Sequence, residues 1–191
     1  GANRLGTNSL LEALVFGRRA GKKMLDDVPQ LQLSPVNEER EVSATQRELE
    51  ELYEGPATED LDTIREELKQ MMTTQVGVYR EAAEMEPAQA KLRELRERFA
   101  KVRVGDKGKV FNINLLEAAG LGNMLEFSEL ILDWAMALQE SRGAHFRNDF
   151  PTRDDNNWLK HTLAFRTEDG GHELRYKPVT ITKYQPEERK Y

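Results

Sequence analysis

The sequence of 191 residues contains no cysteine. This absence excludes disulfide bonds, thiolate chemistry and any iron–sulfur cluster held by cysteines of these residues. No apolar run approaches the roughly 18 residues that a membrane-spanning helix requires. Histidine occurs only at His145, His161 and His172, which lack metal-ligand spacing, so we expect no metal site. The glycine-rich G-x-G-x-x-G fingerprint of dinucleotide-binding proteins is absent as well.

There is no excess of positive charge, since 28 basic residues stand against 34 acidic ones and the formal net charge is −6. This balance gives no electrostatic reason to expect a nucleic-acid partner. The charges are segregated: residues 38–67 carry 12 acidic and 3 basic residues, whereas residues 87–103 carry 6 basic and 2 acidic ones. We interpret this pattern as neighbouring helices of opposite charge.

Helical periodicity covers the middle of the chain. Two prolines, Pro29 and Pro35, indicate an extended connector over residues 24–41, and Ser43 fits the first position of a capping box for a helix that ends near Tyr53. A second helix is predicted over residues 59–84, with an apolar stripe at three- and four-residue steps. Its members are Leu61, Ile64, Leu68 and Met71.

Two more helices follow in the sequence. Pro87 suits the first turn of one, whose stripe contains Leu92, Leu95, Phe99 and Val102. The other is predicted over residues 113–141, where a regular stripe marks the side expected to pack against the other helices. That stripe contains Met124, Phe127, Ile131, Trp134 and Leu138. Three long helices with short connections predict an antiparallel three-helix bundle.

The period changes from helical to alternating after the bundle. Leu159, His161, Leu163 and Phe165 occupy alternate positions, as do Leu174 and Tyr176, and a Glu-Asp-Gly-Gly turn lies between the two runs. This predicts a C-terminal β-hairpin, whose second strand is limited by Pro178. The fold class expected from the whole sequence is therefore mainly α, with a hairpin at its end.

The first 23 residues, GANRLGTNSLLEALVFGRRAGKK, combine a glycine-containing loop with the start of an apolar helix. Ser9 and Glu12 fit a capping box, so we expect Ser9 to cap this helix. Free N–H groups at the helix start, next to the guanidinium of Arg4, would favour an anionic ligand. Because residue 1 is a glycine within a motif, we expect a piece of a longer polypeptide.

GANRLG with TNSLLEALVFGRRAG resembles a segment of succinate dehydrogenase and fumarate reductase flavoprotein subunits. SRGAHFRNDFPTRDDNNWLKHTLAF (residues 141–165) and VTITKYQPEERKY (residues 179–191) resemble the C-terminal domain of the same subunits. The resemblance implies three parts. Residues 1–41 would be the end of an FAD-binding domain, with one helix of that domain, followed by a linker. Residues 42–142 would form the helical bundle, and residues 143–191 would form the hairpin region.

The resemblance also implies an activity, the oxidation of succinate to fumarate by hydride transfer to FAD. Arg4 would bind a substrate carboxylate, and Ser9 and Leu10 would contact FAD. The proton-accepting arginine and the flavin-carrying histidine of the family lie in earlier segments, so no catalytic residue and no bound FAD are expected within this piece alone. Electrons would pass to an iron–sulfur subunit, and membrane anchor subunits would hold the protein peripherally at the cytoplasmic face of the membrane.

Two other functions remain as alternatives, a piece of an L-aspartate oxidase-like flavoprotein and a stand-alone helical interaction module. The titratable residues from Arg142 to Asp155 are expected to be structural rather than catalytic, joining bundle to hairpin through arginine–carboxylate pairs. Leu10, Leu14 and Val15 would be exposed without an FAD domain, so self-association through this helix is a further expectation.

Overall fold

The computed structural model describes residues 8–33, 35, 37–167 and 171–187. The chain is mainly helical, and its described elements occur in a simple order. The helices are α1 (Asn8–Asp27), a short 3-10 helix (Val28–Gln30), α2 (Glu38–Glu54), α3 (Leu61–Gln75), α4 (Ala82–Phe99), α5 (Ile113–Ala137) and α6 (Asp155–Trp158). The strands are β1 (Tyr79–Arg80), β2 (Phe146–Arg147), β3 (Lys160–Arg166) and β4 (His172–Pro178).

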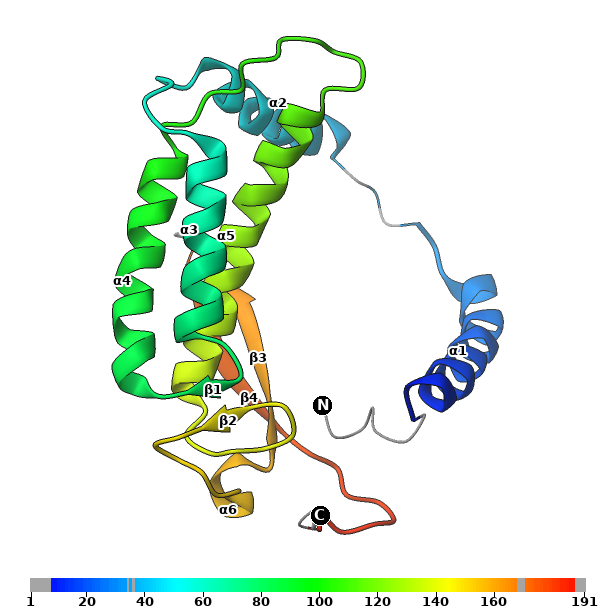
Figure 1. Ribbon diagram of the computed structural model, residues 1–191. Coiled ribbons are helices and arrows are strands. Elements are labelled where there is room, and N and C mark those ends of the chain that lie inside the picture. The colour runs from blue at the N-terminus through cyan, green and yellow to red at the C-terminus, as the bar shows by residue number, and fades with distance from the viewer. Residues whose placement is uncertain (1–7, 34, 36, 168–170, 188–191) are drawn as a thin grey trace.

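Helices α3, α4 and α5 lie side by side and alternate in direction, so the predicted antiparallel three-helix bundle is confirmed (Figure 1). Helix α2 crosses one end of the bundle and contacts α5, whereas α1 stands apart from it (Figure 1). The buried core comes from the predicted stripes of α3 and α4 and from α5. It includes Ile64, Leu68, Met71, Leu92, Leu95, Leu121, Leu125 and Leu132.

The long helix predicted over residues 59–84 is wrong, because α3 ends at Gln75 and α4 begins at Ala82. The backbone of Gly77 passes so close to the carbonyl of Thr73 that no side chain would fit there. Pro87 lies inside α4 rather than at its start. At the sixth position of the helix, a proline loses the hydrogen bond to the carbonyl of Ala83 and its ring crowds that carbonyl. The packing of α4 against α3 and α5 offsets this cost.

Both predicted serine caps are wrong. Helix α1 already includes Asn8, which places Ser9 within its first turn, and α2 begins at Glu38, several residues before Ser43. The side chain of Asn37 caps α2 by accepting a hydrogen bond from the N–H of Arg40 at 3.1 Å. An asparagine side chain caps a helix as well as serine does, so the earlier cap extended the helix into the predicted connector.

The packing side of α5 differs from the prediction. Ala118, Leu121, Leu125, Leu132 and Ala135 are buried in the core. Of the stripe expected there, Met124 and Phe127 are exposed, Ile131 and Trp134 are half-buried, and only Leu138, just beyond the helix, is buried. The helix is apolar on two sides, and its sequence alone does not distinguish the side that faces the bundle.

The C-terminal β-hairpin is confirmed, with β3 and β4 paired antiparallel and Pro178 at the end of β4. The register pairs Ala164 with Leu174 and Thr162 with Tyr176. Because side chains alternate between faces, Leu163 and Phe165 therefore lie on the face opposite Leu174 and Tyr176. A second, very short sheet joins β1 to β2 in parallel and so connects the α3–α4 junction with the segment after α5.

Ion pairs between α3 and α4 confirm that the segregated charges belong to neighbouring helices. Arg98 of α4 donates to both carboxylate oxygens of Glu67 at 2.8 and 2.9 Å and to Glu59 at 2.9 Å. Lys91 reaches Glu67 as well, at 2.7 Å. Within the described residues, no helix is both long and apolar enough to span a bilayer.

Candidate functional site

The predicted ligand-binding residues belong to the N-terminal segment. Arg4 lies outside the described residues, so its position relative to the helix is not part of the structure. Ser9 and Leu10 both lie in the first turn of α1, where Ser9 is half-buried and Leu10 is 70% exposed. No acidic side chain occupies this first turn. The positive end of the helix dipole suits an anionic ligand, and Glu12 is the first acidic residue, just after this turn.

One side of α1 is unusually apolar for a helix that stands alone. Leu11, Leu14 and Val15 lie on this side and are all more than half exposed. A helix usually buries such residues against another part of a protein or a ligand. Together with the exposed Leu10, these side chains form a surface that could cover an aromatic ring system, so the residues of α1 are compatible with a flavin.

A second group of functional side chains lies where α5 ends, next to β1 and β2. Arg147 is 1% exposed and forms two hydrogen bonds to Asp149, at 2.6 and 2.7 Å. Its remaining terminal nitrogen donates to the carbonyls of Ala135 at 2.8 Å and Met136 at 3.1 Å. A buried guanidinium at the last carbonyls of a helix stabilises the negative end of its dipole.

The carboxylate of Asp149 connects this cluster to α4, because it accepts a hydrogen bond at 3.0 Å from the N–H of Ala82, the first residue of that helix. The hydrogen bonds from Arg147 lower the pKa of Asp149 to about 2. The carboxylate therefore remains ionised at neutral pH and cannot serve as a general acid there.

His145 is held in one neutral tautomer. Its Nδ1 lies 2.9 Å from Nη1 of Arg80, and since arginine only donates, Nδ1 must accept. Its Nε2 lies 3.0 Å from the carbonyl oxygen of Leu138, so Nε2 carries the proton. Burial lowers the pKa of His145, and the positive charges of Arg80 and Arg147 lower it further. Both nitrogens are engaged inside the protein, which supports a structural role.

Glu140 is another buried member of the cluster. It accepts two hydrogen bonds from Arg142, at 2.7 and 2.9 Å, and one from the N–H of Asp154 at 2.9 Å. Arg142 also reaches Asp155, at the start of α6, at 2.6 Å. These contacts agree with the structural role expected for residues 142–155, although they join helix ends more than they join bundle to hairpin. Arg80 and Glu140 had no sequence signal, because their partners are brought together only by the fold.

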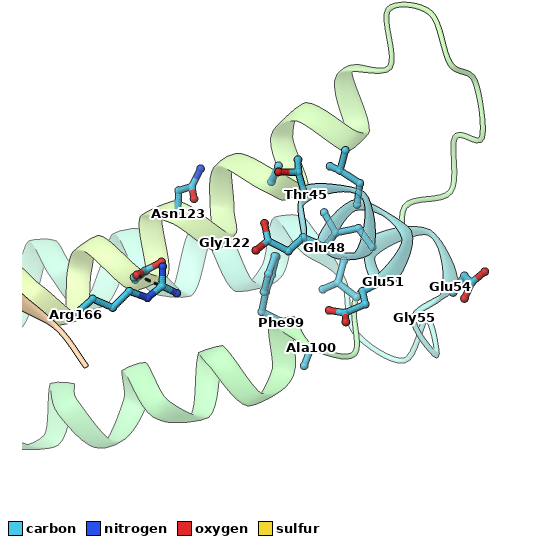
Figure 2. Close-up of a pocket in the computed structure, with 15 residues that line it drawn as sticks. Thr45, Glu48, Glu51, Glu54, Gly55, Phe99, Ala100, Gly122, Asn123 and Arg166 are labelled. Atoms are coloured by element: carbon cyan, nitrogen blue, oxygen red, sulfur yellow. Dashed lines mark ion pairs between the residues drawn. The ribbon is translucent and has the colours of Figure 1, made fainter. Parts of the chain in front are cut away.

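A cavity with a volume of about 750 Å³ lies between α2, the end of α4 and α5 (Figure 2). Glu48, Glu51, Glu54 and Glu126 line it, with Arg166 as the basic residue. Arg166 is itself 3.7 Å from Glu126. A dicarboxylate would be repelled by this surplus of negative charge, so the cavity is unsuited to such a substrate.

The described ranges contain no cluster of three histidine or acidic side chains that could hold a metal ion. Two features are therefore left as candidates for function: the start of α1, which suits an anion, and the apolar side of the same helix. The cluster of buried charges at the end of the bundle is structural.

The chain is similar to proteins of known family. The family model for the C-terminal part of the fumarate reductase flavoprotein matches residues 65–191. The fumarate reductase flavoprotein subunit of Haemophilus influenzae is 41% identical over the whole chain, and the succinate dehydrogenase flavoprotein subunit of Coxiella burnetii is 37% identical over 95% of it. These matches cover 32% and 30% of the two relatives.

A solved structure of a variant of the flavoprotein of Escherichia coli quinol fumarate reductase is also similar. It superposes with a TM-score of 0.86 and is 40% identical, and the match covers 98% of this chain and 33% of that one. The chain thus spans about a third of the length of the relatives it matches. It belongs to the family of fumarate reductase and succinate dehydrogenase flavoprotein subunits, and the greater part of it corresponds to their C-terminal region.

Proposed function

We propose that this chain is the C-terminal portion of a flavoprotein subunit that interconverts succinate and fumarate, with FAD as its redox cofactor. The observation that supports this most strongly is the similarity along the whole chain to fumarate reductase flavoprotein subunits, which includes α1 as well as the bundle. Flavoproteins of this kind hold their flavin in the full-length subunit, and the flavin supplies hydride acceptance when succinate is oxidised.

Arg4 is the residue to which we assign substrate binding. Oxidation of a dicarboxylate requires that one carboxylate be held while a hydride leaves the neighbouring carbon, and a guanidinium holds a carboxylate through two parallel hydrogen bonds. Ser9 and Leu10 would contact the flavin from the first turn of α1. Free backbone N–H groups at this helix start would stabilise negative charge on a reduced ring.

Electrons from the flavin would pass to a separate iron–sulfur subunit. Membrane anchor subunits would then keep the assembly at the cytoplasmic face of the membrane, with this subunit bound peripherally. This part of the proposal is supported by the name of the similar Escherichia coli protein, which is a quinol fumarate reductase. The 191 residues alone would be inactive and colourless, because one carboxylate-binding arginine supplies neither the proton relay nor a complete flavin site.

The decisive experiment replaces Arg4 in the complete subunit. Arg4→Ala is expected to lower kcat/KM for succinate by about 100-fold or more while the flavin content stays unchanged, because one fixed charge is lost from the transition state. Arg4→Lys keeps the charge without the bidentate geometry and should recover part of the activity. Unchanged succinate turnover in Arg4→Ala would refute the assignment.

A further inference from the structure

Helix α5 has a second apolar side that the bundle leaves uncovered. Ile113, Leu116, Met124 and Phe127 follow one another at helical spacing, and we refer to them as the outer stripe of α5. Leu116 is 71% exposed and Phe127 is 63% exposed. Half-buried Ile131 and Trp134 continue the same row toward the end of the helix. A helix that is apolar on both sides is normally buried on both.

The acidic residues of α5 have partners elsewhere in the chain. All four acidic side chains of the helix pair with neighbouring elements. Glu117 pairs with Arg65 of α3 at 2.6 Å, and Glu129 pairs with Arg96 of α4. Glu126 lies 3.7 Å from Arg166 of β3.

The fourth acidic residue, Asp133, lies between two elements. It accepts a hydrogen bond from Gln89 of α4 at 2.6 Å and pairs with His172 of β4 at 2.9 Å. Surface helices of soluble proteins present charges to water and apolar side chains to the core. In α5 each acidic side chain instead pairs with a side chain of a neighbouring element, and the outer stripe is left to apolar residues. Its composition is that of an interface that is fully covered.

The arrangement of α1 indicates what covers the stripe. Figure 1 shows α1 apart from the bundle on the side where α5 lies, with open space between them. The match to the Escherichia coli structure extends over 98% of this chain, so a complete subunit shares this separation of α1 from the bundle. That subunit is about three times as long as the matched segment. Two segments that do not touch keep a fixed separation when other polypeptide lies between them, and the additional length of that subunit can supply it.

We propose that the outer stripe of α5 is the docking surface for the flavin-binding part of the same subunit. This inference rests on the proposed function, since it requires the longer flavoprotein of which the chain would be the C-terminal portion. The docked surface would be apolar and without unpaired charge, because Ile113, Leu116, Met124 and Phe127 offer no group that could pair with one. The stripe would then fix the bundle relative to the helix that approaches the flavin.

The absence of cysteine from the chain permits a direct test by thiol labelling. Leu116→Cys and Phe127→Cys are made singly, with Val78→Cys as the matched control, because Val78 is 70% exposed but lies outside α5. Each variant is prepared as the 191-residue chain and as the complete subunit. The rate of alkylation by N-ethylmaleimide is measured at that site by peptide mass spectrometry. Met124→Cys removes less volume and replaces Phe127→Cys if the latter reduces the helical circular dichroism signal.

The expected result is that alkylation at Leu116→Cys and Phe127→Cys is at least tenfold slower in the complete subunit than in the chain alone, with Val78→Cys changed less than twofold. Equal rates in the two preparations would overturn the inference. Protection that grows with the concentration of the chain alone, or that needs an added iron–sulfur subunit, would overturn it too, in favour of another occupant.

Flavin content and succinate turnover of the complete, unlabelled subunit separate this inference from the proposed function. A subunit that lacks both refutes the proposed function, whatever the labelling rates are. A subunit that contains flavin and turns over succinate, but whose outer stripe is labelled as fast as in the chain alone, refutes only the docking surface.

Discussion

Arg147 and Asp149 form a bidentate ion pair that joins the end of α5 to the beginning of α4. The guanidinium contacts the last carbonyls of α5, and the carboxylate accepts the first N–H of α4. Each charge therefore lies at the helix end whose dipole it complements, and each neutralises the other. This pair holds the two helices of the bundle in a fixed relation at the end where β1 and β2 meet.

Removal of the carboxylate from this pair should be strongly destabilising. Asp149→Ala leaves the guanidinium of Arg147 buried without a counter-charge, and we expect a loss of about 3 kcal/mol in the free energy of unfolding. Urea denaturation followed by circular dichroism measures it. Asp27→Ala is the control, because it removes a carboxylate from an exposed pair with Lys23 and should cost less than about 0.5 kcal/mol. Equal effects of the two variants would contradict the role of the buried pair.

His145 should make the protein less stable as the pH falls below 6.5. Burial and the nearby arginines lower its pKa in the folded chain, so between the lowered value and 6.5 the unfolded chain binds more protons. Stability is therefore complete above pH 6.5 and declines below it. His145→Gln can still accept from Arg80 and donate to Leu138 but does not titrate.

The measurement for His145 is the urea midpoint at pH 7.5, 6.5 and 5.5. We expect His145→Gln to flatten the decline between pH 7.5 and 5.5 relative to the unaltered chain. His161→Gln, at an exposed position on the hairpin, should leave the slope unchanged. A decline that is just as steep in His145→Gln would show that other groups cause it.

Glu67 should contribute stability that disappears in acid. Hydrogen bonds from Arg98 and Lys91 lower the pKa of Glu67 from 4.5 to about 2. Its contribution is therefore present above pH 4.5 and is lost as the pH falls from there toward 2. Glu67→Gln should cost on the order of 1 kcal/mol at pH 7, since the pair is partly exposed to solvent.

Thermal unfolding at pH 7 and pH 3 tests this expectation, and the difference between Glu67→Gln and the unaltered chain should shrink at pH 3. Glu66→Gln provides the comparison, because Glu66 pairs with Lys69 on the exposed side of the same helix at 2.7 Å. Its effect should be small at both pH values. A constant difference for Glu67→Gln at the two pH values would rule out the titration.

Gly55 should tolerate no side chain. It ends α2, and a Cβ atom at this position would overlap the carbonyl oxygen of Val102. We expect Gly55→Ala to cost about 1–3 kcal/mol, because backbone rather than a flexible side chain must move. Gly17→Ala on α1 has nothing within 4 Å and should leave the stability unchanged or raise the helicity. The two variants are compared by urea denaturation, and a neutral Gly55→Ala would show that α2 can shift on the bundle.

Much of the architecture could be predicted from local patterns. The stripe of Ile64, Leu68 and Met71 identified the buried side of α3 but not the end of that helix, and the change to alternation with a glycine turn identified the hairpin. The family was recognised from motifs at both ends of the chain, and Ser9 and Leu10 remain predicted flavin contacts. The helix caps were predicted less well, because Ser9, Ser43 and Asn37 are all chemically suitable caps and only one can start each helix.

The sequence by itself determined that the middle of the chain is helical and that the two alternating runs near its end form a hairpin, because both depend on residue spacing within an element or between neighbours in the sequence. The tertiary structure alone decided which side of α5 entered the core, since Leu125 and Phe127 are both apolar and only the position of α3 and α4 selects between them. It also created the cluster of Arg80, His145 and Arg147, whose members lie up to 67 residues apart and have no local reason to meet.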